Sequence, residues 1–274
     1  NPVEHTLSPL IHNYLADKMD KNMVYVPFMV EEGRLEDAVK GAFGLNILGC
    51  NVTVPYKNEV IPYLAEVDEL AAKMGSVNTL VRTQTGYKGY NTDMTGLYRA
   101  MCSDGVSIEG EQVVVLGAGG VGRAVAFMCA AKGAEKVWLL NRTLDKAQTV
   151  AEEVNRAEKR QCVCALAIDE YGKLPDRKYL VIQSTSVGLY PHVNDAVITD
   201  AAFYQKVKAG YDLIYRPWET RFMKLVKAQG APAYNGLKML LYQGVEAFEM
   251  WNQCKIEDES AYKLYELLKT AVVQ

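Results

Sequence analysis

The sequence predicts an α/β protein of two domains. Its 274 residues exceed the roughly 150 residues of one ordinary domain. Strand-like and helix-like segments alternate along the chain, which predicts a parallel sheet with right-handed crossovers. The sequence pattern also changes near Glu111, after which a glycine-rich turn joins an apolar strand of the buried type to an apolar helix.

In the first third, apolar and β-branched runs predict strands, and apolar residues at helical spacing predict helices. The expected strands are 23–28, 47–54, 77–83 and 86–89, and the expected helices are 35–43, 60–74 and 95–101.

From Glu111 onward the same criteria predict a nucleotide-binding type of domain. The expected elements are strands 112–116, 136–140, 179–183 and 209–214, helices 123–132 and 144–158, and C-terminal helices 239–251 and 259–273.

Composition and charge exclude several classes of protein. The chain is 49% hydrophobic and 23% charged, which is typical of globular proteins and not of disordered ones. Thirty basic and 33 acidic residues give a net charge of −3, so a large nucleic-acid surface is not expected. The longest apolar stretch, 124–131, is far shorter than the ~20 residues of a membrane span. We therefore expect neither a nucleic-acid nor a membrane partner.

The cysteines and histidines predict neither disulfides nor a metal site. The six cysteines show no C-x-x-C spacing and mostly lie in apolar segments, which indicates reduced, buried thiols of a cytoplasmic protein. The three histidines, His5, His12 and His192, are too scattered to form a metal site. No signal sequence is visible, but the chain opens at Asn1 without Met. The alternative of a removed organellar targeting segment is therefore left open.

The glycine turn carries the strongest signal. Gly117, Gly119 and Gly122 form G-x-G-x-x-G between a strand and a helix, followed by a second strand. In such a β-α-β unit the glycines allow a tight turn, close approach to a pyrophosphate and close helix packing. The helix N-terminus then offers free amides to the phosphates. An ordinary strand–helix turn is the alternative, but we expect a Rossmann-like domain with a dinucleotide on residues Gly117, Ala118, Gly119, Gly120, Val121 and Gly122.

The end of the second strand indicates which dinucleotide is bound. NAD sites usually place an acidic residue there, whereas this chain has Asn141, Arg142 and Thr143, with Lys146 one turn beyond Arg142. A guanidinium, an ammonium and a hydroxyl suit a 2′-phosphate. A solvated basic helix start, the alternative, would oppose the helix dipole. The sequence therefore favours NADP over NAD.

Polar residues of the first third gather at turns and strand ends, where α/β proteins bind ligands. They lie in four segments, namely Thr6–Ser8, Asn51–Lys57, Ser76–Thr79 and Asn91–Asp93. Thr6 and Ser8 either cap the following helix or bind an anionic ligand.

These segments, taken with the rest of the chain, resemble the shikimate dehydrogenase family over essentially its whole length. The matching motifs are H-T-L-S-P, N-V-T-V-P-Y-K, S-V-N-T, G-Y-N-T-D, V-L-G-A-G-G-V-G-R-A, N-R-T, S-T-S-V-G, Y-D-L-I-Y and N-G-L-K-M-L-L-Y-Q-G. The resemblance implies reversible NADPH-dependent reduction of 3-dehydroshikimate to shikimate, and it places the family's catalytic Lys and Asp at Lys57 and Asp93. A lysine ammonium suits the stabilisation of a developing alkoxide. Which of the two residues transfers the proton stays open.

The resemblance also implies the ligand contacts. For the substrate these are Thr6 and Ser8 at the carboxylate, Asn51, Thr53, Asn78, Asp93 and Gln243 at the ring hydroxyls, and Tyr215 on the carboxylate side. For the cofactor they are the glycine turn, Asn141, Arg142, Thr143, Lys146, Thr185, Ser186, Leu213, Gly236 and Met239.

One residue departs from the family pattern. Thr6 stands where the family most often has Ser, and its extra methyl group crowds the carboxylate site. A quinate/shikimate dehydrogenase of broader substrate or cofactor specificity is therefore an alternative. A second alternative is a catalytically silent relative that senses the same ligands, but the presence of Lys57 and Asp93 argues against it. A third alternative is that the chain is one module of a longer protein.

The resemblance completes the expected organisation. We expect a substrate-binding domain at 1–93 plus 238–274 and an NADP-binding domain at 94–237. Asn1 falls where the family's first strand has just ended, so that strand is expected to be missing from this sequence. The expected partner is a small-molecule substrate, and a homodimer is left open.

Overall fold

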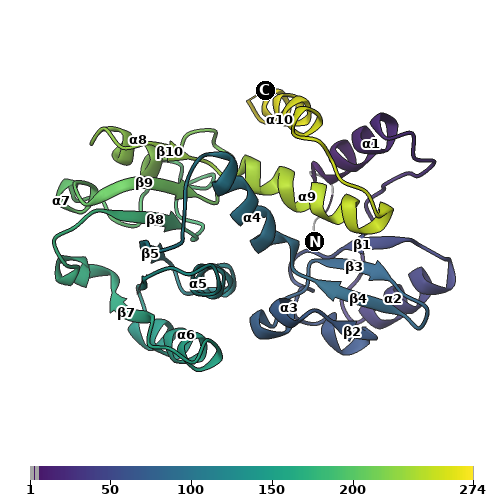
Figure 1. The fold of residues 1–274 in the computed structure, drawn as a ribbon, viewed down its shortest axis with the longest axis horizontal. Coiled ribbons are helices and arrows are strands. Elements are labelled where there is room, and N and C mark those ends of the chain that lie inside the picture. The colour runs from purple at the N-terminus through teal and green to yellow at the C-terminus, as the bar shows by residue number, and fades with distance from the viewer. Residues whose placement is uncertain (1–2, 4–5, 274) are drawn as a thin grey trace. The chain divides into compact units, whose positions relative to one another are not determined.

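A computed structural model describes residue 3 and residues 6–273 of the chain. The sequence features at Asn1, Pro2 and His5 lie outside the described residues. The chain divides into two compact units, coloured in Figure 1 along the sequence. Unit 1 contains the chain up to Leu97 together with Met239–Ala271, and unit 2 contains Tyr98–Lys238 and the last residues. No helix of the described residues is long and apolar enough to cross a membrane.

Unit 1 is built on a mixed sheet of four short strands. The strands are β1 (Gly49–Asn51), β2 (Glu66–Val67), β3 (Thr79–Arg82) and β4 (Tyr87–Tyr90), in the order β1-β3-β4-β2. β3 pairs antiparallel with both β1 and β4, while β2 pairs parallel with β4. Side chains alternate across a strand, and Leu80 and Tyr87 lie in one core with Leu35 and Val39 of the helix α2.

Unit 1 also contains helices. α1 (Ser8–Lys18), α2 (Leu35–Gly44), the short 3-10 helix η1 (Ile61–Tyr63) and α3 (Glu69–Met74) lie entirely in it. The first half of α4 (Thr92–Ser103) and most of α9 (Leu237–Asn252) and α10 (Asp258–Val273) also belong to it. Trp251 of α9 donates its indole N–H to the Leu80 carbonyl oxygen at 2.8 Å. Its ring fills the space that a Cβ on Gly49 would need. The helix α9 is thereby fitted against the sheet of unit 1.

Two sequence expectations in unit 1 are wrong. Residues 21–30 form no strand, because no strand of the described residues pairs with them; instead the Asn13 amide bonds to both backbone groups of Tyr25, at 2.7 and 3.0 Å. The expected helix 60–74 is split into η1, β2 and α3. Ala65 N–H bonds to the Tyr87 carbonyl oxygen, and Asp68 then caps a new helix by accepting from the Leu70 amide at 3.0 Å.

Unit 2 has a six-stranded parallel sheet, which confirms the expected fold class. Its strands are β5 (Gln112–Leu116), β6 (Lys136–Asn141), β7 (Val163–Ala167), β8 (Tyr179–Gln183), β9 (Val207–Asp212) and β10 (Ala233–Tyr234). They lie in the order β10-β9-β8-β5-β6-β7. The order reverses direction between β5 and β8, and ligands of such sheets bind at the carboxyl ends of the strands at this point.

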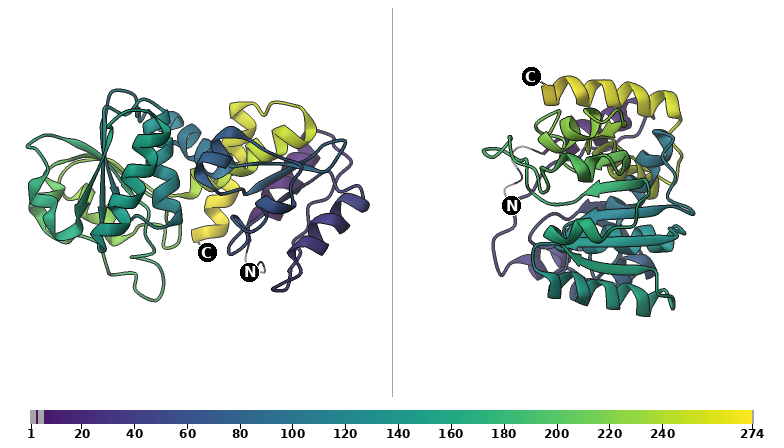
Figure 2. Two further views of the ribbon diagram at one scale, coloured as in Figure 1. Left: turned by 90° about the horizontal axis from the view of Figure 1, so that it is seen from below. Right: turned by 90° about the vertical axis from the view of Figure 1, so that its left-hand side faces the viewer.

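Helices cover both faces of the unit 2 sheet. They are α5 (Gly120–Ala131), α6 (Leu144–Ala157), η2 (Ile168–Lys173), α7 (Ala201–Tyr204) and α8 (Arg221–Lys227). Val114 and Leu116 of β5 pack in one core with Phe203 of α7 and Phe222 of α8. Figure 2 shows α5 and α6 on the opposite face. The α5 helix ends as the sequence predicts, because Gly133 follows it with φ +81°.

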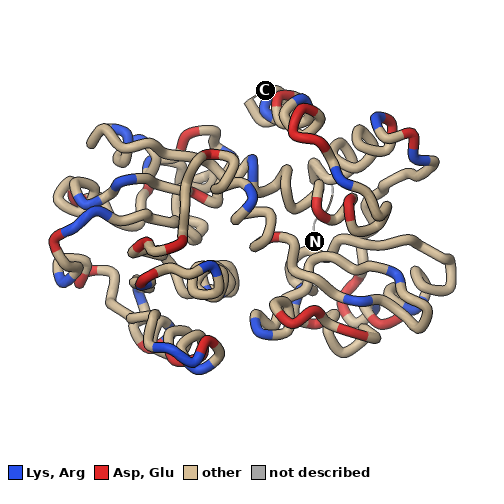
Figure 3. Tube along the Cα trace, in the orientation of Figure 1, with Lys and Arg blue, Asp and Glu red and all other residues tan. Residues whose placement is uncertain are grey.

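The surface and the cysteines agree in part with expectation. Basic and acidic residues are interspersed along both units, as Figure 3 shows. All six cysteines are free thiols, but they are not uniformly buried. Cys129 and Cys162 are buried, Cys102 is exposed, and the other three are half-buried. The expectation of buried thiols is therefore wrong for Cys102.

Candidate functional site

Lys57 and Asp93 form an ion pair in unit 1. The Lys57 ammonium lies 2.7 Å from the Asp93 carboxylate, and both side chains are mostly buried, at 26% and 19% exposure. The Lys57 carbonyl oxygen accepts the Val77 amide at 2.8 Å, which fixes the turn carrying the lysine beside the start of β3. The ammonium keeps donor capacity for a second acceptor, since it has three protons.

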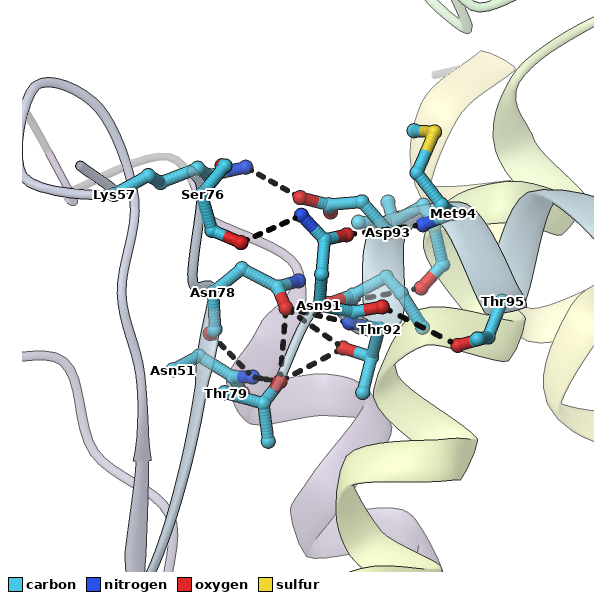
Figure 4. Close-up of polar contacts among 12 residues, drawn as sticks. Asn51, Lys57, Ser76, Asn78, Thr79, Asn91, Thr92, Asp93, Met94 and Thr95 are labelled. Atoms are coloured by element: carbon cyan, nitrogen blue, oxygen red, sulfur yellow. Dashed lines mark hydrogen bonds and ion pairs between the residues drawn. The ribbon is translucent and has the colours of Figure 1, made fainter. Parts of the chain in front are cut away.

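The carboxylate of Asp93 is placed by the first turn of α4. Asn91 caps this helix by accepting the Met94 amide at 3.2 Å, and its own amide group donates to the Ser76 carbonyl oxygen at 3.0 Å. Helix N-termini carry free amides and partial positive charge, which favour a carboxylate. Asn91 therefore ties the turn of Ser76 to the helix that carries Asp93 (Figure 4).

Asn51 and Asn78 lie next to each other in the same cluster. The Asn51 amide nitrogen donates to the Asn78 backbone oxygen at 3.3 Å and to the Thr79 hydroxyl at 3.1 Å. Asn51 comes from β1, and Asn78 directly precedes β3, with which β1 pairs. The sheet register therefore brings two of the expected substrate residues together.

Thr6 and Ser8 lie at the beginning of α1. The Thr6 hydroxyl accepts the Ser8 amide at 3.2 Å and donates to the Ser8 hydroxyl at 3.1 Å. The N-cap residue, Leu7, has no side-chain cap, but the Thr6 hydroxyl accepts the amide of Ser8, the first residue of the helix, so the capping alternative is confirmed for Thr6. The Thr6 proton is used in the bond to Ser8, so Thr6 keeps only acceptor capacity for a ligand, whereas the Ser8 hydroxyl keeps a proton of its own.

Tyr25 links these hydroxyls to the amides, and sequence reasoning did not single it out. Its hydroxyl donates to the Asn51 side-chain oxygen at 3.0 Å. Burial raises the pKa of Tyr25 to about 12, against an opposing hydrogen bond with Ser8. Its ring stacks on His12 at 4.3 Å between centroids. The phenol is therefore neutral at pH 7.

His12 is a buried histidine behind Tyr25. Its side chain is fully buried, and neither ring nitrogen has a well-formed hydrogen bond to any described residue. Burial lowers the pKa of His12 to about 3, and the nearby Asn51 side chain opposes this only partly. The ring is therefore an uncharged packing group between Tyr25 and Trp251.

The remaining expected substrate residues are less constrained. Thr53 is exposed. Gln243 of α9 is 8% exposed and donates to the Leu240 carbonyl oxygen at 2.9 Å. A Cβ on Gly96 of α4 would collide with the Gln243 backbone, so this glycine lets α9 approach α4 closely. Tyr215 lies in unit 2 and is half-buried.

In unit 2 the glycine turn joins β5 to α5 as the sequence predicts. Gly117 has φ +106°, and a Cβ there would lie 2.6 Å from a Thr185 methyl carbon. A Cβ on Gly122 would collide with the Gly117 carbonyl oxygen, whereas Gly119 and Gly120 face open space. The Ala118 amide donates to the Asn141 side chain at 3.1 Å. The turn thus leaves free backbone beside the α5 N-terminus, as a pyrophosphate requires.

The loop after β8 lies against this turn. The Ser184 hydroxyl donates to the Leu116 carbonyl oxygen at 2.8 Å, at the point where the strand order reverses. Gln183 accepts the Thr185 amide at 2.5 Å and donates to Asp212 at 3.3 Å. Burial raises the pKa of Asp212 to about 6, partly offset by its hydrogen bonds, of which Thr220 gives the strongest.

The expected cofactor residues lie around these loops. Gly236 donates its amide to the Ile214 carbonyl oxygen at 3.0 Å and packs against Leu213 so closely that a Cβ would not fit. Val121 and Ser186 are exposed, and Met239, the first residue of the returning segment of unit 1, is half-buried.

Arg142, Thr143 and Lys146 test the fit of NADP. All three are exposed at the end of β6 and the start of α6, and neither cation has an ion-pair partner among the described residues. Asn141 turns its amide toward the glycine turn and the Thr143 carbonyl oxygen. Exposed cations beside the glycine turn fit a 2′-phosphate, so the residues present suit NADP.

The fold and these two groups of residues define a two-domain, dinucleotide-linked oxidoreductase. Residues 1–80 match the family model of the shikimate dehydrogenase substrate binding domain, and residues 101–203 match that of shikimate / quinate 5-dehydrogenase. The chain belongs to the shikimate dehydrogenase family, as its motifs predict.

Relatives and solved structures agree. The chain is 40% identical to the NADP(+) shikimate dehydrogenase of Caldanaerobacter subterraneus over 253 residues, covering 92% of this chain and 89% of that one. It is similar to a Listeria monocytogenes shikimate 5-dehydrogenase in complex with shikimate and NAD, at TM-score 0.90 and 29% identity over 98% and 93% of the two chains. A Corynebacterium glutamicum quinate dehydrogenase in complex with NAD has TM-score 0.88 and 27% identity over 98% and 96%.

Proposed function

We propose that this chain reversibly reduces 3-dehydroshikimate to shikimate with NADPH, and that Lys57 and Asp93 are its catalytic pair. Family membership and the NADP(+)-linked relatives support the reaction. The ion pair of 2.7 Å at the start of α4 supports the assignment of the two residues, and it is the observation that carries it.

When bound, NADPH supplies a hydride to the ring carbonyl carbon, and a proton from the Lys57–Asp93 pair to the carbonyl oxygen completes the hydroxyl. Lys57 donates a hydrogen bond to the carbonyl oxygen and stabilises the negative charge that develops there. Asp93 holds the ammonium in place through the ion pair, and it accepts a hydrogen bond from a neighbouring ring hydroxyl. Both side chains are mostly screened from water, which strengthens these interactions.

The other substrate contacts in the proposal follow the family. Thr6 and Ser8 bind the substrate carboxylate, and Tyr215 contacts the carboxylate side of the substrate. Asn51, Thr53, Asn78 and Gln243 bind the ring hydroxyls. The proximity of Asn51 and Asn78, and the contact of Ser8 with Tyr25, support placing these groups in one binding region of unit 1.

The cofactor contacts in the proposal lie on the loops of unit 2. They comprise Gly117, Ala118, Gly119, Gly120, Val121, Gly122, Asn141, Thr185, Ser186, Leu213 and Gly236, with Met239 beyond them. Arg142, Thr143 and Lys146 bind the 2′-phosphate and set the preference for NADP. Residues 94–237 would form the cofactor domain, and 1–93 with 238–274 the substrate domain.

The proposal includes a small-molecule substrate, a cytoplasmic location, no nucleic-acid partner and a homodimer as the form to test first. A quinate/shikimate dehydrogenase is the second candidate, favoured by Thr6 at the carboxylate site and by the similarity to a quinate dehydrogenase.

Initial rates on a grid of shikimate or quinate with NADP+ or NAD+ test the function. We expect the highest kcat/KM for shikimate with NADP+. Comparable rates with quinate would favour the second candidate, and Thr6→Ser would then lower quinate turnover. Absence of turnover in every combination would refute the enzyme assignment.

The variant Lys57→Met tests the catalytic pair. It removes the ammonium but keeps most of the side-chain volume. Shikimate binding, measured by calorimetry, should change little while kcat falls by about 10²–10³-fold. Unchanged turnover would refute the role of Lys57.

A further inference from the structure

A buried hydroxyl pair lies behind the expected substrate amides. Thr79 and Thr92 are both fully buried, and their hydroxyl oxygens are 2.7 Å apart. The Thr79 hydroxyl also lies 3.2 Å from the Asn78 side-chain oxygen, as does the Thr92 hydroxyl. Figure 4 shows dashed lines from the Thr79 hydroxyl to Asn51, Asn78 and Thr92. Neither threonine is among the expected ligand contacts.

The orientation of the Asn78 amide is fixed by its backbone partner. The Thr92 amide N–H donates to the Asn78 side chain at 2.7 Å, so the atom that it meets must be the oxygen. Of the two hydroxyl protons, one lies between Thr79 and Thr92 and the other points to this oxygen, whichever threonine donates. The two lone pairs of the Asn78 oxygen are therefore filled by one N–H and one O–H.

Asn78 consequently offers a ligand only donors. Its amide nitrogen has no partner among the described residues. Asn78 is 2% exposed, and the two His12 nitrogens are the only fully buried side-chain polar atoms without a partner in the described part of the chain, so the Asn78 nitrogen lies at the small part of this residue that is not buried. Its two protons are free to bond to an oxygen of a ligand.

Asn51 has the opposite polarity. Its nitrogen donates to the Asn78 backbone carbonyl oxygen, which can only accept, and to the Thr79 hydroxyl. Both amide protons are thereby used, and the Asn51 side-chain oxygen faces the Tyr25 hydroxyl at 3.0 Å. Asn51 therefore meets a ligand only through this acceptor oxygen.

We infer that Thr79 is a positioning residue that holds the two amides in these opposite orientations, with a donor at Asn78 and an acceptor at Asn51. This rests on the proposed function, since it specifies how the site of that function recognises a hydroxylated ring. A ring hydroxyl at Asn51 donates its proton, and an oxygen at Asn78 accepts one. Without the Thr79 hydroxyl, the Asn51 nitrogen loses an acceptor, and one of the two alternative proton donors to Asn78 disappears.

The variants Thr79→Val and Thr79→Ser test this assignment by kinetics. Val keeps the shape but removes the hydroxyl, whereas Ser keeps the hydroxyl. We expect Thr79→Val to raise the KM for shikimate about tenfold or more while the KM for NADP+ stays within about twofold. Thr79→Ser should restore the shikimate KM to within about threefold. Thr270→Val, the same substitution on the exposed face of α10, serves as the control.

A purely structural role of Thr79 predicts a different pattern. It would lower the melting temperature and change both KM values together, without selective rescue by Ser. That result, or an unchanged shikimate KM in a folded Thr79→Val protein, overturns the inference.

Proton exchange of the Asn51 side-chain amide separates this inference from the proposed function. Asparagine-labelled, ligand-free protein should show slow exchange in the wild type and in Thr79→Ser, and at least about tenfold faster exchange in Thr79→Val. If the wild type does not oxidise shikimate, the proposed function fails, but the exchange rates still test whether the Thr79 hydroxyl fixes the Asn51 amide. Equal exchange rates in all three proteins would refute the role of Thr79 in holding this amide.

Discussion

Buried polar side chains occur in both units, but they bond to different things. In unit 1, Thr79 and Thr92 bond directly to the expected substrate residues Asn51 and Asn78. In unit 2, the buried Gln183 and Asp212 bond mainly to loop backbone, and the expected cofactor cations are exposed. The comparison indicates two modes of recognition. Unit 1 presets the direction of hydrogen bonds, whereas unit 2 offers backbone amides and solvated charge.

The largest effect on activity is expected from a substitution in the proposed catalytic pair of unit 1. Asp93→Asn keeps the size and the acceptor oxygen but removes the charge that orients Lys57. We expect kcat to fall by about 10²–10⁴-fold in steady-state assays, with the KM for NADP+ nearly unchanged. Asp145→Asn, on the exposed start of α6, is the matched control. A fall of less than threefold would contradict the assigned role of Asp93.

Burial of His12 predicts a pH dependence that belongs to unit 1. The pKa of His12 is about 3 in the folded protein against an ordinary value of 6.5, so the unfolded chain takes up the proton first as the pH falls. The contribution of the neutral, buried His12 to the free energy of unfolding is complete above pH 6.5 and is lost as the pH falls toward 3. Relative to His12→Phe, the free energy of unfolding of the wild type should decrease by up to about 1.4 kcal/mol per pH unit below that point.

Urea denaturation at a series of pH values measures this difference. Asp212 has the opposite sign, because its raised pKa makes the folded state keep its proton longer as the pH rises. Comparing wild type with His12→Phe at each pH cancels that contribution.

In unit 2 the exposed cations should control cofactor choice and little else. Arg142→Ala with Lys146→Ala is expected to raise the KM for NADP+ at least about tenfold and to leave the KM for NAD+ within about twofold. The reason is that only NADP+ carries the 2′-phosphate. Lys159→Ala, also exposed in unit 2, should change neither value. Equal losses for both cofactors would place the two cations elsewhere than at the 2′-phosphate.

The smallest effect is expected from salt. Raising the ionic strength from about 0.05 to 0.5 M screens exposed charges more than buried hydrogen bonds. The KM for NADP+ should rise several-fold, and the KM for shikimate should change less than about twofold. A stronger salt dependence for shikimate would remove the contrast between the two units.

The sequence predicts the nucleotide unit well because its signals are local. Gly117, Gly119 and Gly122 lie within one turn, and the strands on either side are continuous apolar runs. The family resemblance, and not spacing, points to Lys57 and Asp93, which are far apart in the chain. The structure then places their charged groups in contact.

Long-range partners explain what the sequence does not predict. Residues 23–28 have strand-like composition, but no strand of the described part of the chain pairs with them, and Asn13 bonds to the backbone of Tyr25 instead. Thr79 and Thr92 stand inside recognised motifs, yet their role depends on each other and on Asn51, more than twenty positions earlier. Tyr25 and Gly96 carry no motif at all. Their positions matter only once the sheet and helices are in place.

The fit of Trp251 against Gly49 and Leu80 has a consequence for synthesis on the ribosome. The sheet of unit 1 is translated early, but the tryptophan that packs on it follows only after residues 98–238. Domains generally fold as units in the order in which they emerge. Unit 2 is therefore expected to complete its fold while the sheet of unit 1 still lacks its last helices, and a chaperone bound to a stalled nascent chain should shield that uncovered sheet.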